Sequence, residues 1–365
     1  MIETLLIFLL VDAVLFAIFM YAPVMRGEDV FFGVRVGTDF YNGEGRKLLH
    51  RYWFWLSMTF IEIELIGAII SVYRGGISAA QIAPRILILP LTTVLYVIFY
   101  RQVKAYELPE ENRRFASALI TRRLGDYTSI AVEIAVTILI LLPTLVLVYY
   151  YPKLPARIPV HWNLWGEPDA WARKNFGAVF FLPLMGVYMQ GAFLLLKHAL
   201  LGVKMTLPAE KAQEYLHYKE MFLRTSLKLL DRVRVILAFM FCTMALEIVF
   251  TALDDMNKLA RVLLFVDIAT LALLIACCAY ACYRLVKIDR ELKTKVGRVY
   301  VQRSSDAAHW YAGGLLYFNP QDPALVVEKL AGFGYTLNMA NKRAYVYLAY
   351  LICTPLLISW LLSGA

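Results

Sequence analysis

The residue types that could bind a ligand are concentrated in one short segment, residues 152–175. Its four prolines forbid a continuous helix and favour a turn-rich conformation. The segment predicts a ligand-binding site made of Pro159, His161, Trp162, Asn163, Gly166, Asp169 and Lys174. The alternative explanation is an aromatic belt at the membrane surface, with Asn163 and Asp169 acting as turn and capping residues.

A second set of polar residues falls inside long apolar stretches and consists of Asp12, Glu62, Glu64, Glu247 and Asp267. A carboxylate inside a bilayer costs several kcal/mol, so each of these residues needs an explanation. Glu62 and Glu64 are two residues apart, which places them about 200° apart around a helix and prevents them from facing one partner. Glu133 lies one turn from a helix end and reads as an ordinary interfacial residue.

Basic partners for these acids are not evident, because Arg85 and Lys197 are expected at helix ends. We therefore expect the acids to be protonated, hydrogen-bonded to hydroxyls such as those of Ser57 and Thr59, solvated in a cavity, or bound to a cation.

The elements that carry both sets are helices long enough to cross a membrane. The chain has 365 residues, of which 60% are hydrophobic and 18% charged, outside the usual range of soluble proteins. A span needs about 20 apolar residues. The fold class predicted is an all-α integral membrane protein with about eight transmembrane helices and a small α+β cytoplasmic insert before the last one. The predicted spans are Glu3–Met25, Tyr52–Tyr73, Pro84–Tyr100, Ile130–Tyr151, Phe176–Leu196, Val235–Leu253, Val262–Tyr283 and Tyr345–Leu362.

The formal net charge of +9 predicts the orientation of these spans. Alternate loops carry 28 and 8 Lys and Arg residues, and the positive-inside rule places the richer set in the cytoplasm. Both termini and segment 152–175 are then expected outside the cell. The basic loops lack the interleaved aromatic residues of a nucleic-acid surface, so we expect no nucleic-acid partner.

The last basic loop, 287–342, is long enough to fold. It predicts a strand, an Asn319-Pro320 turn, a helix from about Pro323 to Lys329 opened by Asp322, and a second strand. The residues singled out there are Tyr317, Asn319, Pro320, Asp322, Pro323, Gly332, Gly334 and Asn338. Gly332-x-Gly334 does not match a dinucleotide fingerprint, so we expect a packed structural unit or a docking surface for a cytoplasmic regulator.

The resulting domain organisation has four parts: an N-terminal membrane region (1–128), a four-span domain with the external loop (129–285), the insert (286–344) and a last helix (345–365). The five cysteines all fall in predicted spans, without the spacing of a zinc site or a disulfide framework. No metal or cofactor is expected.

The motif Ile158-Pro159-Val160-His161-Trp162-Asn163, followed by Gly166, Pro168-Asp169, Trp171 and Lys174, resembles the signature loop of a bacterial membrane-protein family of otherwise unknown function. The best understood relatives in that family are bacteriocin immunity proteins similar to SdpI, which protects cells against the sporulation-delay toxin. The insert likewise resembles a small domain of unknown function found beside such loops. The immunity proteins are shorter and lack this insert.

The resemblance implies a bacterial cell-membrane protein with an immunity or receptor-like role, sensing or sequestering a peptide toxin or envelope-active compound. The alternative is a secondary transporter, or a proton- or cation-coupled permease, that uses the intramembrane carboxylates. An intramembrane enzyme is the weakest of the three, since no His-Glu-x-x-His helix occurs and no span pairs Ser with His.

Overall fold

The computed structural model describes residues 2–25, 30–74, 82–108, 115–118, 122–163, 167–203, 205–208, 211–253, 257–296, 309–329 and 335–363. The chain divides into two compact units, each described by itself. Unit 1 comprises residues 1–112 and 302–340, and unit 2 comprises residues 113–301 and 341–365.

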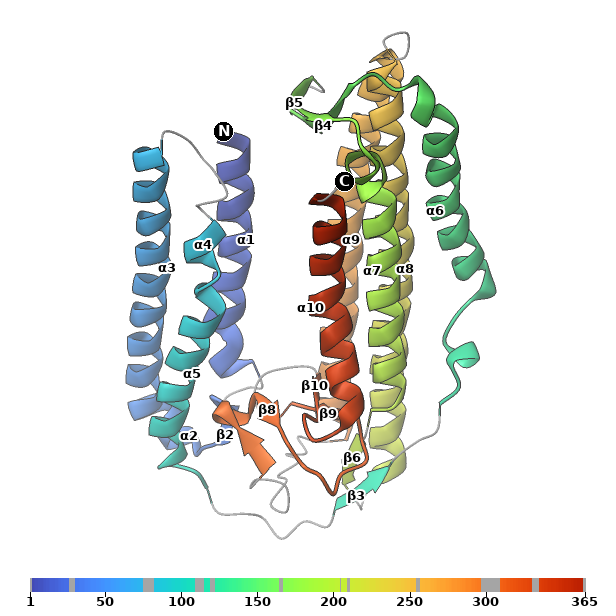
Figure 1. Cartoon of the computed structure of the whole chain (residues 1–365). Helices are drawn as coiled ribbons and strands as arrows, with labels where there is room; N and C mark the ends of the chain where they lie inside the picture. The colour runs from blue at the N-terminus through green and yellow to red at the C-terminus, as the bar shows by residue number, and fades with distance from the viewer. Residues whose placement is uncertain are drawn as a thin grey trace. The chain divides into compact units, whose positions relative to one another are not determined.

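Unit 1 is built on helices α1 (Ile2–Tyr21), α3 (Arg46–Arg74), α4 (Ile82–Arg85) and α5 (Ile88–Lys104), with the short α2 (Thr38–Phe40) before α3, all seen in blue and cyan in Figure 1. A tight hairpin of β1 (Val30–Phe31) and β2 (Val34–Arg35) closes one end of its core. Phe32 and Gly33 form the turn with φ of 49° and 78°, values that match the right-handed twist of paired strands. The buried ring of Phe32 packs against Tyr52, Tyr96 and Phe99.

Part of the predicted insert belongs to unit 1. It forms two short strand pairs, β7 (Trp310–Tyr311) with β8 (Leu316–Tyr317), and β9 (Val326–Glu328) with β10 (Tyr335–Leu337). Leu315 packs against the same core cluster as the β1–β2 hairpin. The insert therefore lies at the end of unit 1 that carries the first basic loop.

The helix predicted from Pro323 to Lys329 is wrong, because that stretch contains strand β9 and no helical residue. Two local preferences account for the difference. The Asp322 carboxylate accepts the Ala324 N–H at 3.0 Å, which closes a turn rather than capping a helix. The β-branched pair Val326-Val327 then favours extended backbone, which β10 stabilises.

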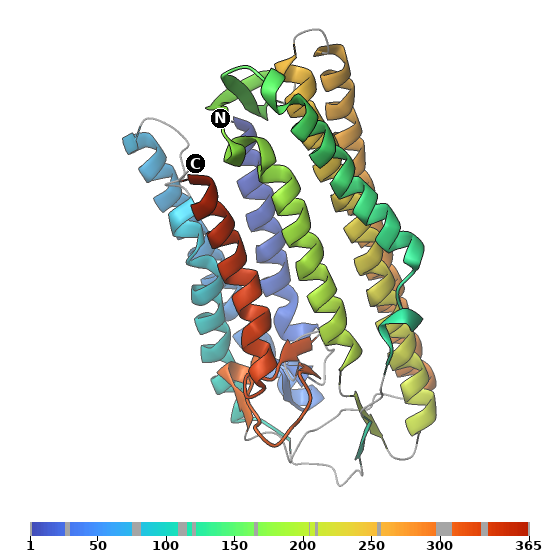
Figure 2. The ribbon, with the colours of Figure 1, turned by 45° about the vertical axis from the view of Figure 1, so that its right-hand side comes forward.

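Unit 2 is a bundle of five long helices: α6 (Ile130–Tyr150), α7 (Phe176–Leu201), α8 (Ala212–Ala252), α9 (Asn257–Lys295) and α10 (Lys342–Ser363). Helix α8 packs against α6, α7 and α9, and α10 packs on α7 (Figures 1 and 2). One end of the bundle carries strands β4 (Arg157–Trp162) and β5 (Pro168–Arg173). The opposite end carries β3 (Phe115–Ala118) paired with β6 (Met205–Pro208).

Five helices of the described chain are long and apolar enough to cross a membrane, and lie at 38–70, 130–153, 176–201, 212–252 and 262–295. The predicted multi-span helical architecture is confirmed at this level. The remaining three predicted spans correspond to α1, α5 and α10, which are helical. Helix α5 has 17 residues and extends about 25 Å, short of a hydrocarbon layer of about 30 Å. The total of eight spans stays a prediction.

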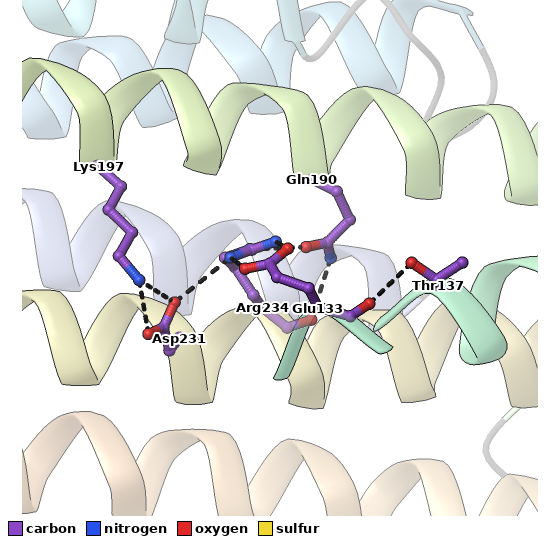
Figure 3. A network of polar contacts seen from close by, with 6 residues as sticks. All are labelled: Glu133, Thr137, Gln190, Lys197, Asp231 and Arg234. Carbon is purple, nitrogen blue, oxygen red and sulfur yellow. Dashed lines mark hydrogen bonds and ion pairs between the residues drawn. The ribbon is translucent and has the colours of Figure 1, made fainter. Parts of the chain in front are cut away.

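A network of charged side chains joins α6, α7 and α8 inside the bundle (Figure 3). Lys197 Nζ lies 2.6 Å from both carboxylate oxygens of Asp231. The two terminal nitrogens of Arg234 each donate to one carboxylate oxygen of Glu133 at 2.7 Å, and one of them also reaches Asp231 at 3.3 Å. Gln190 completes the arrangement by accepting from Arg234 Nε and donating to the Arg234 carbonyl, both at 3.0 Å.

This network corrects the interpretation of Lys197 as a residue at a helix end, whereas Glu133 lies in the first turn of α6, as the sequence predicts. Helix α7 continues past Lys197 to Leu201, and α8 begins long before Arg234, so the side chains of both Lys197 and Arg234 are almost wholly buried. Two cations and two carboxylates balance one another, which makes their burial tolerable.

Helices α7 and α10 meet through two tyrosines. The Tyr350 hydroxyl donates to the Tyr188 carbonyl at 3.1 Å, and the Tyr188 hydroxyl donates to the Leu351 carbonyl at 2.9 Å. Their rings stack with centroids 5.6 Å apart. Gly191 permits this approach, because a Cβ there would overlap the Tyr350 hydroxyl and lie 2.8 Å from its Cζ.

Gly191→Ala is expected to destabilise unit 2 by about 1–3 kcal/mol, because the added methyl must displace Tyr350 and break its hydrogen bond. Thermal unfolding of the purified chain in detergent measures the effect. Gly186→Ala is the matched control in the same helix, where the new Cβ would meet Phe241 at an ordinary 3.7 Å. Equal midpoints for the two variants would contradict the close approach.

Asp231→Ala is expected to cost about 3–5 kcal/mol, because it leaves the buried Lys197 ammonium without its anion. The double variant Lys197→Met, Asp231→Ala removes both charges and should be less destabilised than the single variant. Denaturant titration of the detergent-solubilised protein compares the two. The single variant Lys197→Met completes the comparison, and a double variant as unstable as the sum of the two single variants would show that the pair is not coupled.

Candidate functional site

The predicted binding segment folds as an antiparallel hairpin of β4 and β5. Prolines exclude helix here, as the sequence predicts, and Asn175 then starts α7 by accepting the Ala178 N–H at 2.7 Å. The hairpin follows directly from α6 through a short 3-10 turn, Tyr151–Lys153. It is thus tied at both ends to helices of the bundle.

The register of this hairpin contains two irregularities next to each other. Pro159 lies opposite Trp171 and His161 lies opposite Ala170, which leaves Val160 without a counterpart. Trp162 lies opposite Pro168, which leaves Asp169 without one. Such bulges bend a strand and re-aim its side chains. Val160, His161 and Asp169 are all exposed as a result.

The other face of the hairpin is anchored to the helices. Ile158 is fully buried in a cluster with Leu147, Val179 and Ile248, which come from α6, α7 and α8. Trp162 Nε1 donates to Thr251 Oγ1 of α8 at 3.2 Å. Further anchoring comes from Lys174, whose ammonium donates to the Leu154 carbonyl at 2.8 Å and lies 5.4 Å from the centroid of the Tyr151 ring.

A His–Asp pair stands on the exposed face. His161 Nδ1 lies 2.5 Å from Asp169 Oδ1, and the two side chains are 59% and 46% exposed. The carboxylate fixes the orientation of the imidazole, which leaves Nε2 as the ring nitrogen available to a ligand. Trp171 and Val160, 46% and 42% exposed, add apolar surface on the same hairpin. We call these four residues the hairpin face.

The structure thus separates the predicted binding residues into two groups. Only His161 and Asp169 project outward, whereas Pro159 is buried, Trp162 contacts α8 and Lys174 bonds the segment that follows α6. Asn163 shapes the turn, since its side-chain oxygen accepts the Glu167 N–H at 3.0 Å. Gly166 lies outside the described residues. Trp171 and Val160 were missing from the predicted set because the segment was predicted to be turn-rich, and its Trp residues have an alternative explanation as an aromatic belt.

The acids of unit 1 do have a basic partner, which corrects the expectation that none was in reach. Arg85 Nε donates to Asp12 at 2.8 Å, and its Nη2 donates to the two oxygens of Glu64 at 2.9 and 2.7 Å. Arg85 ends the short helix α4, and its long side chain extends to the carboxylates of α1 and α3. Glu62 is exposed on α3, whereas the Glu64 carboxylate accepts from Arg85.

The hydroxyls suggested as partners of these acids are engaged elsewhere. Ser57 and Thr59 donate to the backbone carbonyls of Trp53 and Trp55, four residues earlier in the helix. In unit 2, by contrast, Asp267 of α9 does meet a hydroxyl, that of Thr243 on α8. Glu247 is buried beside Asp267.

In the insert, four of the predicted residues converge in one hydrogen-bond network. Asn338 is fully buried and donates to the Asn319 and Asp322 carbonyls at 2.9 and 3.0 Å. The Tyr317 hydroxyl donates to the Asp322 carboxylate and accepts from the Asn319 amide, both at 3.0 Å. These polar groups form hydrogen bonds with one another, as expected for a packed structural unit. Pro320 and Pro323 lie exposed in the turns, and Gly332 and Gly334 fall outside the described residues.

At the end of unit 2 away from the hairpin, Arg122 bonds the Glu220 carboxylate and the Leu201 carbonyl. The Tyr127 hydroxyl lies 3.1 Å from the other Glu220 oxygen. Burial, together with the adjacent Glu220 charge, raises the pKa of Tyr127 above its usual value. Within the described part of the chain, no three His, Cys, Asp or Glu side chains are grouped so that they could hold a metal ion.

Two family models match parts of the chain. A domain of unknown function (DUF1648) matches residues 138–187, which run from within α6 through the hairpin into α7. A family of unknown function (DUF5808) matches residues 320–345, which include β9 and β10 of the insert. No curated protein and no solved structure matches the chain. The chain is therefore similar, over these two stretches, to a domain and a family whose function is unknown.

Proposed function

We propose that this protein resides in the bacterial cell membrane and binds a peptide toxin or envelope-active compound through the hairpin face, in an immunity or receptor-like role. The observation that supports it best is the outward His161–Asp169 pair beside exposed Trp171, on a hairpin anchored to α6, α7 and α8. Ligand sites are commonly carried by loops that a rigid scaffold positions.

The chemistry of the hairpin face suits a peptide. The Asp169 carboxylate accepts from an amide or ammonium group, and His161 Nε2 donates or accepts according to its tautomer. Trp171 offers a large apolar surface with little conformational entropy to lose on binding. Because the hairpin is already fixed by Ile158 and Trp162, binding need not order it.

The proposed orientation follows the charge distribution of the loops. The excess of Lys and Arg in the other set of loops supports an orientation with the hairpin face and both termini outside the cell. The insert then faces the cytoplasm, where it is available to a regulator. The proposal describes a binding protein and not an enzyme.

His161→Ala with Asp169→Ala is expected to abolish protection of a sensitive bacterial strain that expresses this chain and is challenged with the sporulation-delay toxin. The reason is that the double variant removes both polar groups of the hairpin face. Survival against toxin concentration is the measurement. The pair is exposed and contributes little to stability, at most about 1 kcal/mol, so the variant should still fold.

Two further variants make the result decisive. Lys153→Ala, at the same end of unit 2 but off the hairpin face, should leave protection intact. Ile158→Ala should lower stability by about 2–5 kcal/mol through a cavity in the buried cluster. This variant shows how protection changes when the hairpin loses its anchor while the residues of the hairpin face are kept. Equal survival of cells with the parent chain and the double variant, or no protection by the parent chain, would count against the proposal.

A second candidate function is proton- or cation-coupled transport. It is favoured by the charge balance at Arg85, where two carboxylates, Asp12 and Glu64, meet one guanidinium. A proton or cation would neutralise the remaining negative charge, and intramembrane acids of this kind mark ion pathways in transporters.

Coupled transport predicts proton entry into vesicles that contain the purified chain and a pH-sensitive dye, under an imposed potassium diffusion potential. Glu64→Gln should abolish the flux because it removes the excess carboxylate. Glu62→Gln, an exposed position on the same helix, should leave it unchanged. If vesicles with the parent chain take up protons no faster than protein-free vesicles, this candidate is ruled out.

A further inference from the structure

The pair of acids between α8 and α9 differs from the other buried charges of unit 2. Glu247 and Asp267 are 3% and 9% exposed, and Glu247 Oε1 lies buried without a hydrogen-bond partner among the described residues. Lys197, Asp231 and Arg234 are all ion-paired in the network of Figure 3. Among the described residues, no basic side chain has a charge or hydrogen-bond interaction with the carboxyl group of Glu247 or of Asp267.

The two carboxyl groups are near enough to form a direct side-chain hydrogen bond. Two ionised carboxylates have no hydrogen to donate, so this contact requires a proton on one of them. Leaving both charged would also place two like charges side by side in a medium of low dielectric constant, which strongly favours retention of one proton.

The neighbouring groups indicate which of the two carboxyl groups holds the shared proton. The Thr243 hydroxyl contacts Asp267 and lies one helical turn from Glu247, on the same side of α8. The single hydrogen of the Thr243 hydroxyl can go to Asp267 or to the Phe239 or Met240 carbonyl, and when it goes to Asp267 it stabilises that carboxyl as the anion. Glu247 Oε1 has no donor. Glu247 is therefore the better proton carrier and Asp267 the acceptor.

We propose that Glu247 and Asp267 form a proton-binding site between α8 and α9, in which Glu247 carries the proton and donates it to Asp267. This site goes beyond the binding role of the hairpin and does not depend on it. The described titratable groups around it are Glu247 and the Cys242 thiol from α8, and Asp267 from α9. On the opposite side of α8, Ala245, Ile248 and Val249 meet apolar residues of α6 and α7.

The test uses infrared difference spectra of the full chain in lipid nanodiscs, recorded between neutral and alkaline buffer with choline as the cation. The parent chain should show a protonated-carboxyl C=O band at neutral pH that shifts in heavy water. Glu247→Gln should remove this band, because the amide cannot carry the proton. Asp267→Asn should shift it, because the acceptor changes from a carboxylate to an amide.

Glu62→Gln is the control, since it removes an exposed carboxyl elsewhere and should leave the band unchanged. Thermal unfolding verifies that each variant is folded, and Glu247→Gln keeps the shape of the protonated acid. A spectrum of folded Glu247→Gln identical to that of the parent overturns the proposal. So does loss of the band at neutral pH when sodium or potassium replaces choline, which would assign the site to a metal cation.

Discussion

Neutralisation of the charges inside α8 is the constraint on which the rest of unit 2 depends. Asp231 and Arg234 lie in the interior of a 41-residue helix, and each needs an opposite charge from a neighbour. Glu133 of α6 and Lys197 of α7 supply those charges, with Gln190 bonding both the Arg234 side chain and its backbone. A shift of either helix along α8 would break several contacts at once, so the network fixes their register.

The same three helices carry the hairpin at their other end. Leu147, Val179 and Ile248 come from α6, α7 and α8, and together they bury Ile158. The position of the hairpin therefore depends on a charge network far from it along the helices. The hairpin face itself makes weak, exposed interactions, which leaves His161 and Asp169 available for binding while the buried face maintains the fold.

Much of this arrangement follows from local features of the sequence. Prolines in segment 152–175 exclude helix, apolar runs predict the long helices, and the two-residue spacing of Glu62 and Glu64 predicts their different environments. Charge partners distant in the sequence were not predictable in this way, since Arg85 meets Asp12 from 73 residues away and Arg234 meets Glu133 from 101. The i, i+3 spacing of Asp231 and Arg234 was the available sign that both residues belong to the long helix α8. Opposite charges at this spacing stabilise a helix, so the helix need not end where the apolar run ends.

The acids between the helices of unit 2 are of two kinds, and the difference bears on their purpose. Glu133 and Asp231 each meet a cation and thereby hold helices together. Glu247 and Asp267 meet each other, and apolar side chains at these positions would enter a bilayer more favourably. Packing of α8 on α9 therefore does not account for the pair. A carboxyl dyad has two properties that apolar residues lack, a hydrogen bond between helices and the capacity to bind and release a proton. The second property is the physical reason to expect a functional role between α8 and α9.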